Sequence, residues 1–282
     1  MNYVQQFIFF LQQRKAVNLL LVFLYFIFIE VMHNSLVQVS VWIEKNLTIE
    51  IYNLLVAGVF LFVIILLLLA VAKRLQQNKD EVVLKIFYLT STLLLIITHS
   101  RFMFDSNIEV IHSFEFTILA FLLFPFTRRF GAAILFTLPF MLVDEWYQYT
   151  VLYPWIDYFD LNDVLMDTYG CGLFITLLFV LGVKGSTNVR PFYKRTEFIL
   201  LFAFAIIILV LAKLCFVAAY TGEACSNTLL VMNKSMTTES FWRAHPTHHI
   251  FYHVMKPLEG LAAIIAIHIF YMGLDSLRKH SA

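Results

Sequence analysis

Charged residues are scarce in this chain of 282 residues, since Asp, Glu, Lys and Arg make up only 14% of it and the net charge is +1. This balance gives no sign of a nucleic-acid partner, and no polar stretch is long enough to form a separate soluble domain that would bind one. Hydrophobic residues make up 61% of the chain, and the mean hydropathy is +0.80. A soluble core of this size cannot bury so much apolar surface, so the composition predicts a multi-pass membrane protein.

Several signatures of catalysis are also missing. The sequence contains no serine in a recognisable nucleophile elbow and no glycine-rich phosphate loop, which argues against covalent serine chemistry and nucleotide hydrolysis. The three cysteines, Cys171, Cys215 and Cys225, show no paired spacing. Two of them lie in apolar runs, so we expect small buried hydrophobic side chains there and no disulfide framework.

Long apolar runs are abundant, and a membrane-spanning helix needs about 20 such residues. Eight runs qualify: 16–33, 51–72, 84–99, 108–127, 130–147, 164–183, 197–220 and 255–274. The first is flanked by bulky residues and not by a cleavage site, which favours a retained helix over a signal peptide. The sequence therefore predicts an all-α polytopic bundle of about eight helices, with residues 1–282 forming a single membrane domain.

Basic residues gather in alternate loops, around Arg14, Arg74, Arg128, Lys184 and Lys194 and near the C-terminus. By the positive-inside rule both chain ends lie in the cytoplasm. The four tryptophans and most of the acidic residues fall on the opposite side. We therefore expect a bacterial cytoplasmic-membrane protein whose polar features face the extracytoplasmic side.

The segment from residue 110 to 172 organises these features, because ionisable side chains lie at the outer ends of its apolar runs. Such groups are costly in lipid and normally face a cavity or a partner. The candidates are His112, Glu115, Asp144, Glu145, Gln148, Asp163 and Asp167.

Two Glu and His pairs are spaced three residues apart, Glu30 with His33 and His112 with Glu115, so each pair shares one helical face. His99 closes the third run at the same predicted depth. Glu-x-x-His occurs in bundle cores that bind metals. The alternative is a set of interfacial side chains hydrogen-bonded to neighbouring loops.

The next two runs carry carboxylates at their outer ends. Asp144 and Gln148 share a face, whereas the adjacent Asp144 and Glu145 do not. Asp163 suits the start of a helix, where acids cap the backbone and favour the positive dipole end, and Asp167 lies one turn deeper. Solvated helix ends would also explain these acids.

A His in one helix, Asp-Glu-x-x-Gln closing the next and Asp-x3-Asp-x2-Gly opening a third resemble the VanZ-like family of bacterial membrane proteins over about residues 95–183. The matching positions are His112, Glu145, Gln148, Asp163 and Gly170, with Asp167 where the family more often has Asn. The family usually has an Arg between the Gln and the first Asp, and residues 149–162 contain no basic residue. The resemblance implies an envelope protein, linked in some members to tolerance of glycopeptide antibiotics, with no settled biochemical activity.

Four histidines within nine residues precede the last run: His245, His248, His249 and His253. Three of them repeat every four residues, so a helix beginning near His245 would stack them on one face, as metal ligands require. Glu259 lies behind them on the last helix, and His268 deeper in the same helix reads as a packed core residue. A histidine-rich interfacial loop is the alternative.

Together these residues predict a cavity open to the extracytoplasmic face that holds a divalent metal, most simply zinc. His245, His249 and His253 would be ligands, with His112 or Asp144 completing the shell and Glu145 acting as general base on a metal-bound water. The protein would then be a hydrolase or transferase for a membrane lipid or a lipid-linked envelope precursor. A non-enzymatic factor that binds a lipid-linked or cationic ligand is a second hypothesis, and a transporter is a third.

Overall fold

The structure is a computed structural model that describes residues 3–77, 79–103, 111–186, 192–236, 240–244 and 251–277. Helices dominate it. They are α1 (Tyr3–Gln13), α2 (Lys15–Asn46), α3 (Ile49–Gln77), α4 (Val82–Phe102), α5 (His112–Glu115), α6 (Thr117–Thr127), α7 (Phe130–Tyr147), α8 (Leu161–Val180), α9 (Thr196–Lys213) and α10 (Pro257–Leu277). Short turns of helix occur at η2 (Gln148–Leu152), η3 (Phe192–Lys194) and η4 (Thr221–Glu223).

The predicted bundle is confirmed. Seven helices of the described chain are long and apolar enough to cross a membrane, and residues 112–127 form a shorter apolar pair, α5 and α6. Two boundaries differ clearly from the prediction. Helix α2 continues to Asn46, beyond the end of the predicted run 16–33. Helix α9 ends at Lys213, because residues 217–220 leave the helix and form a strand.

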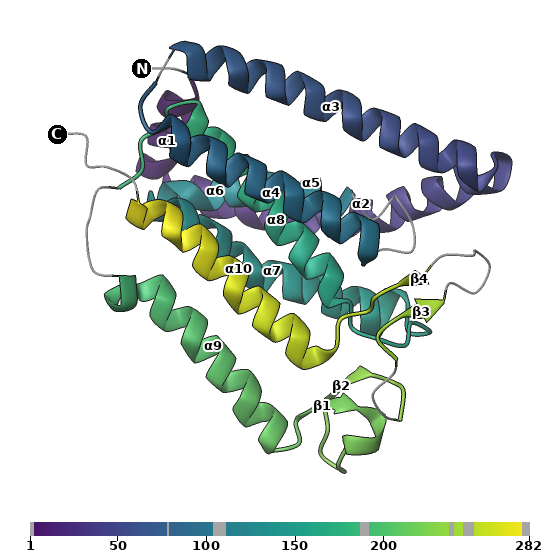
Figure 1. Cartoon of the computed structure of the whole chain (residues 1–282). Coiled ribbons are helices and arrows are strands. Elements are labelled where there is room, and N and C mark those ends of the chain that lie inside the picture. Colours follow the sequence, from purple (N-terminus) through teal and green to yellow (C-terminus); the bar gives the residue numbers. More distant parts are fainter. Residues whose placement is uncertain are drawn as a thin grey trace.

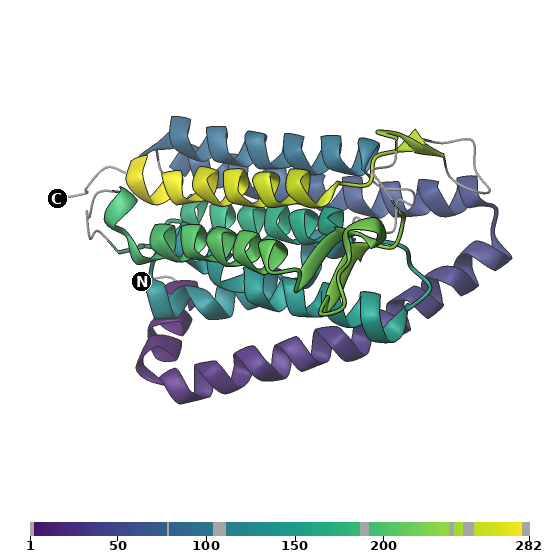
Figure 2. The ribbon, with the colours of Figure 1, turned by 90° about the horizontal axis from the view of Figure 1, so that it is seen from below.

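The long helices run side by side, with the start of α1 and the end of α10 at one end of the bundle (Figures 1 and 2). The strands lie at the opposite end, as both views show. This arrangement agrees with the predicted even number of crossings, which places both termini on one side.

The strand end of the bundle is tied together by main-chain contacts. Strands β1 (Val217–Tyr220) and β2 (Leu230–Asn233) pair in parallel, and β3 (Arg243–Ala244) pairs antiparallel with β4 (Phe251–Tyr252). The loop before α8 packs on β2, since Phe159 N donates to Met232 O at 2.8 Å and Lys234 N donates to Asp157 O at 2.6 Å. Two of the loops predicted to face outward, the one before α8 and the one after α9, therefore contact each other.

Cys215 and Cys225 form a disulfide across η4, with their Cα atoms 5.8 Å apart. The prediction that these two cysteines are unpaired is wrong, because the turn between α9 and β2 brings positions ten residues apart into contact. Cys171 is a free, buried thiol as expected.

Helix α8 is the centre of the bundle, with 83% of its apolar stretch buried, whereas the corresponding figure for α3 is 6%. Two glycines let other elements reach α8 closely. A Cβ on Gly170 would lie 1.8 Å from the carbonyl oxygen of Ser113, and one on Gly172 would lie 2.0 Å from the Tyr271 ring. These close approaches fix α5 and α10 against α8.

Candidate metal centre

Two imidazoles and a carboxylate from separate parts of the chain meet at the strand half of the bundle. His33 comes from α2, while His112 and Glu115 come from α5. One ligand atom of each lies within 4.8 Å of the others, and the three side chains can hold a metal ion. His33 and His112 are both buried, and their rings lie 5.6 Å apart. We call these three residues the candidate metal centre.

Contacts on both sides of α5 position its two ligands. Gly170 allows the α5 backbone to rest directly on α8. From the other side, the Tyr25 hydroxyl on α2 donates to the carbonyl oxygen of Glu115 at 2.9 Å. The chain then breaks at Phe116, so α5 ends after one turn and α6 starts afresh. These contacts hold α2 and α5 at a fixed separation, so that His33 of α2 faces His112 and Glu115 of α5.

The nitrogen–oxygen distances within the candidate metal centre indicate whether these atoms are hydrogen-bonded to one another or placed to bind the same metal ion. His33 Nδ1 lies 3.5 Å from Glu115 Oε1, and His112 Nδ1 lies 3.3 Å from Glu115 Oε2. Good N–H···O hydrogen bonds are about 2.7–3.2 Å long. Two ligands that each lie about 2.0–2.1 Å from a tetrahedral zinc ion are about 3.3–3.4 Å apart. The observed spacing fits the second case better than the first.

Two acids of α8 complete the surroundings of His112. Its Nε2 lies 3.5 Å from Asp163 Oδ2, and its Nδ1 lies 3.6 Å from Asp167 Oδ1. Metal-binding histidines commonly direct their second ring nitrogen at a carboxylate, which fixes the tautomer and the ring orientation. Asp163 is placed for this role, whereas Asp167 lies on the same side as the candidate ligand atoms.

The cluster carries an excess of buried acid. Charges that act on Glu30, Glu115, Asp144 and Asp167 come mainly from one another and from the two histidines. No lysine or arginine in the described part of the chain forms an ion pair with these four carboxyl groups. Buried carboxylates need a counter-charge or a proton. A bound cation would supply the missing positive charge.

Several polar atoms of this cluster make no hydrogen bond to another described residue. They are His33 Nδ1, His112 Nδ1, Glu115 Oε2, Asp144 Oδ1 and Asp167 Oδ1, all of which are inaccessible to solvent. Buried polar atoms are nearly always satisfied in folded proteins. Five such atoms in one cluster therefore indicate a site shaped for an ion, water or substrate.

Asp144 stands beside the candidate metal centre at the end of α7. Gln148 Nε2 donates to Asp144 Oδ2 at 3.0 Å, so the predicted pairing of these two residues on one face is confirmed. The π-helical turn η2 that begins at Gln148 then brings Tyr153 to within 6.4 Å of the His33 ring, measured between ring centroids. Burial raises the pKa of Tyr153, and the charge of Asp144 raises it further, which keeps the phenol neutral. No pattern in the sequence marks Tyr153 as a site residue, because the π-helical turn is what directs it inward.

Glu145 points elsewhere. It is buried, and its Oε1 accepts a hydrogen bond of 2.6 Å from Asp160 N at the start of α8. Its neighbouring charges are Asp163, Asp160 and Asp144, with neither imidazole among them. The structure therefore places Glu145 on the α8 side, and Asp144 is the α7 carboxylate that faces the histidines.

His253 belongs to a second, separate cluster. Its Nδ1 is 2.6 Å from the carbonyl oxygen of Phe241, and its Nε2 is 3.1 Å from Glu259 Oε2. The ring also stacks on Phe241. Both nitrogens are thus engaged, and only the backbone carbonyl of His253 approaches α8, where it accepts from Asn162 Nδ2 at 3.2 Å. The expectation that His253 and the mid-chain acids share one set of ligands is wrong.

The prediction that a helix runs through the histidine-rich segment as far as His253 is also wrong. Residues 251–252 form β4, and α10 begins only at Pro257. The antiparallel pairing of β4 with β3 uses the backbone that a helix would need. His245, His248 and His249 lie outside the described residues.

His99 is buried on α4, with its ring 5.4 Å from that of Tyr169 on α8. It is not a member of the three-residue group that the described chain offers to a metal. His268 is buried in α10, and its Nδ1 is 2.8 Å from the carbonyl oxygen of Ile264. It packs as a core residue, in agreement with the prediction.

Comparisons with protein-family models, with curated proteins and with solved structures found no match to this chain. The function therefore has to be argued from the geometry of the site.

Proposed function

We propose that the candidate metal centre binds zinc and that the protein is a metal-dependent hydrolase or transferase acting on a membrane lipid or a lipid-linked envelope precursor. The observation that carries this proposal is the ligand spacing of 3.3 and 3.5 Å between two buried imidazoles and one carboxylate. The buried carboxyl groups of Glu30, Glu115, Asp144 and Asp167 support it, since none of them forms an ion pair with a described lysine or arginine.

The donor set favours zinc over harder cations. Two histidines and one glutamate are a common arrangement in catalytic zinc sites, which keep a fourth position for water or substrate. Calcium and magnesium prefer sites built almost entirely from oxygen atoms. Asp167, 3.6 Å from His112 Nδ1, is the residue best placed to become a fourth ligand or to bind the water.

The chain supplies a proton acceptor for hydrolysis. A zinc ion held by His33, His112 and Glu115 would lower the pKa of a water molecule and polarise the bond to be cleaved. Asp144 would take the proton from the attacking water, with Gln148 holding its other oxygen. The water oxygen bonds to the acyl or phosphoryl atom of the substrate, the bond to the leaving oxygen breaks, and that oxygen receives the proton. In the transferase version, an alcohol takes the place of water.

The disulfide supports an extracytoplasmic position for this end of the bundle. Disulfides persist in oxidising compartments and are rare in the cytosol, and Cys215–Cys225 lies at the strand end. The basic residues Arg128 and Lys184 lie at the other end, where the Arg128 guanidinium donates to the Lys184 carbonyl oxygen at 2.6 Å. This orientation agrees with the positive-inside prediction.

The sidedness has its own test. Intact cells are treated with a membrane-impermeant reductant and then with an impermeant maleimide. We expect labelling at Cys215 and Cys225 only after reduction, and no labelling of the Cys215→Ser/Cys225→Ser double variant. Labelling that requires permeabilised cells would place the strand end in the cytoplasm.

Membership of a VanZ-like group in the bacterial cytoplasmic membrane remains our proposal, supported by His112, Gln148 and Asp163 gathering at one end of the bundle. A non-enzymatic binding factor is the second candidate function, because the carboxyl groups of Glu30, Glu115, Asp144 and Asp167, which form no ion pair with a described lysine or arginine, also suit a cationic ligand.

Turnover distinguishes the two functions. The purified protein is reconstituted in vesicles with fluorescent phosphatidylethanolamine, and the products are separated after chelator treatment and after re-addition of zinc. We expect turnover that is lost with the chelator, restored by zinc and absent in Asp144→Asn. Stoichiometric zinc without turnover of this or a polyprenyl-linked probe would favour the binding factor.

A further inference from the structure

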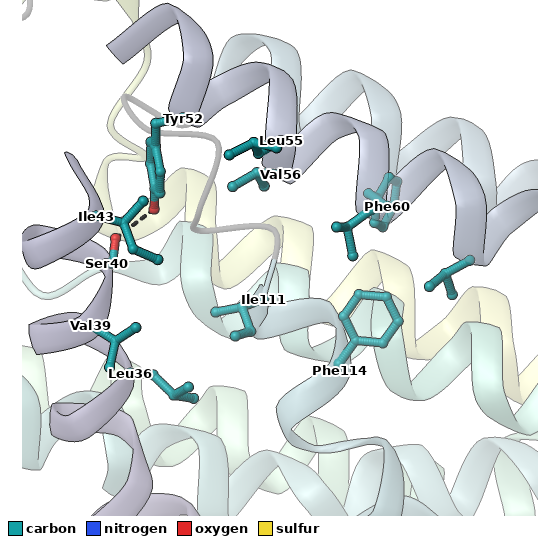
Figure 3. A pocket seen from close by; sticks show the side chains of 12 residues that line it. Leu36, Val39, Ser40, Ile43, Tyr52, Leu55, Val56, Phe60, Ile111 and Phe114 are labelled. Atoms are coloured by element: carbon teal, nitrogen blue, oxygen red, sulfur yellow. Dashed lines mark hydrogen bonds between the residues drawn. The ribbon is translucent and has the colours of Figure 1, made fainter. Parts of the chain in front are cut away.

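A large apolar cavity lies beside the candidate metal centre, between α2, α3 and α5. Its volume is about 600 Å³, within the range of about 300–1,000 Å³ that is typical of small-molecule sites. Figure 3 shows Leu36 and Val39 of α2 on one side, Val56 and Phe60 of α3 on another, and Phe114 of α5 opposite α3. The lining is almost entirely hydrocarbon, so a polar ligand would lose its hydration without replacement.

The cavity and the candidate metal centre are built from the same two elements. Leu36 lies three residues after His33 on α2, and Phe114 directly precedes Glu115 on α5. In the short helix α5, the ligands face α2 and α8 while Phe114 faces the cavity. The cavity and the ligands His112 and Glu115 therefore lie on different sides of the same short helix, α5.

Helix α3 is attached to the bundle near its two ends. Near its start, the Tyr52 hydroxyl and the Ser40 Oγ are 2.5 Å apart (Figure 3). Near its end, Arg74 Nη2 donates to the carbonyl oxygen of Leu181 at 3.1 Å. Figure 1 shows α3 along the edge of the bundle. Lining side chains such as Val39 and Leu55 are about half exposed, at 54% and 52%, so the cavity is open to the surrounding lipid.

The depth of the cavity matches one leaflet of a bilayer. Its α3 lining extends from Tyr52 to Val63, which is a rise of about 16 Å along a helix. The hydrocarbon core of a bilayer is about 30 Å thick, so one leaflet contributes about 15 Å. A single acyl chain that enters sideways from the outer leaflet would have this reach.

We propose that this cavity binds one acyl chain of a bilayer phospholipid and presents the attached head-group region to the candidate metal centre. The presentation step rests on the proposed function, whereas the binding of the chain does not. A second copy of the protein is a poorer occupant, because the space lies between two helices of the same chain whose ends are already joined.

The test uses the full-length protein in vesicles of phosphatidylethanolamine and phosphatidylglycerol in which a fraction of the acyl chains carries a mid-chain diazirine. After illumination, labelled peptides are located by mass spectrometry. We expect the label to concentrate on residues 36–43, 52–63 and 111–114 of the wild type. Even labelling of all lipid-facing helices would overturn the proposal.

A matched pair of variants on α3 sharpens the result. Val56→Trp fills the cavity and is expected to reduce labelling of its lining by about tenfold, because the indole replaces the contacts of the chain. Leu54→Trp adds the same bulk at a side chain that is 72% exposed and does not line the cavity, so labelling should be unchanged. Equal effects of the two variants would contradict the assignment.

Three further readouts separate this proposal from its alternatives. A diazirine-bearing polyprenyl phosphate should label the cavity poorly, and preferential labelling by it would overturn the choice of a phospholipid. Native mass spectrometry should show the same oligomeric state for wild type and Val56→Trp, since a change would indicate a protein occupant. His112→Ala should keep the acyl label while losing metal. The labelling therefore tests acyl-chain binding even if the zinc proposal fails.

Discussion

The two buried histidine clusters of this protein contain similar residues and differ in how they are satisfied. His253 has a carbonyl oxygen at 2.6 Å on one nitrogen and the carboxylate of Glu259 at 3.1 Å on the other. His112 has only carboxylates at 3.3–3.6 Å, and its Nδ1 makes no hydrogen bond to another described residue. Both ring nitrogens of His253 are thus satisfied by other residues, whereas ligand atoms of the candidate metal centre have no hydrogen-bond partner among the described residues.

A structural histidine therefore differs from a candidate ligand in the distances from its ring nitrogens to their neighbours and in whether each nitrogen has a hydrogen-bond partner. Residue type does not separate the two, because each cluster pairs imidazole with glutamate. Burial does not separate them either, since both histidines are shielded from solvent. Zinc binding should therefore depend on His112 and its neighbours and should be independent of His253.

The largest effect is expected for His112→Ala, which removes one of three candidate ligands. Zinc affinity should fall by more than about 100-fold, beyond the 10–100-fold that loss of an outer-shell group costs. Competition with a chromogenic chelator measures the affinity, and inductively coupled plasma mass spectrometry measures the metal content. Wild-type zinc content in this variant would remove His112 from the site.

A smaller loss is expected for Asp163→Asn, which keeps the shape of the side chain but weakens its hold on His112 Nε2. Zinc affinity should fall by about 10–100-fold. Asp160→Asn is the matched control. Its side chain accepts from Asn162 N at the start of α8, and asparagine caps a helix as well as aspartate does, so affinity should not change.

Gly170→Ala tests the support of α5. The new methyl group would collide with the Ser113 carbonyl, and the displacement should cost about 1–3 kcal/mol of stability and weaken zinc binding by about tenfold. Gly58→Ala on α3 has open space at the same atom and should be neutral or stabilising by up to about 1 kcal/mol. Thermal unfolding in detergent and chelator competition measure both effects. Similar behaviour of the two alanines would show that α5 does not depend on this contact.

The smallest effect on zinc is expected at the second cluster. His253→Ala should leave metal content and affinity unchanged, while the loss of the two hydrogen bonds of this buried imidazole lowers stability by about 1–3 kcal/mol. Chelator competition on the folded fraction and thermal unfolding measure the two effects separately. Reduced zinc affinity in this variant, at full folding, would mean that the two clusters are coupled.

The hydrophobic pattern was enough to predict the helices, because each apolar run had to span the membrane. It also identified Glu30–His33 and His112–Glu115 as pairs on single helical faces. The hydrophobic pattern could not predict that α2 lies against α5. The contact between residues 33 and 112 depends on Gly170 and on the break at Phe116.

In three places the structure differs from what local residue spacing predicts. The four-residue repeat from His245 to His253 suggested a helix, but strand pairing at Phe251–Tyr252 overrides it. The spacing predicts Glu145 as the general base, whereas in the structure Glu145 accepts a hydrogen bond from the Asp160 amide at the start of α8. The Cys215–Cys225 bond depends on a turn whose path the spacing does not reveal.

X-ray absorption at the zinc edge of the purified wild-type protein tests the central claim most directly. We expect one zinc ion per chain with only nitrogen and oxygen neighbours at about 2.0–2.2 Å, including imidazole scattering. A protein that takes up no zinc after incubation, or a zinc site with a sulfur neighbour at about 2.3 Å, would contradict it.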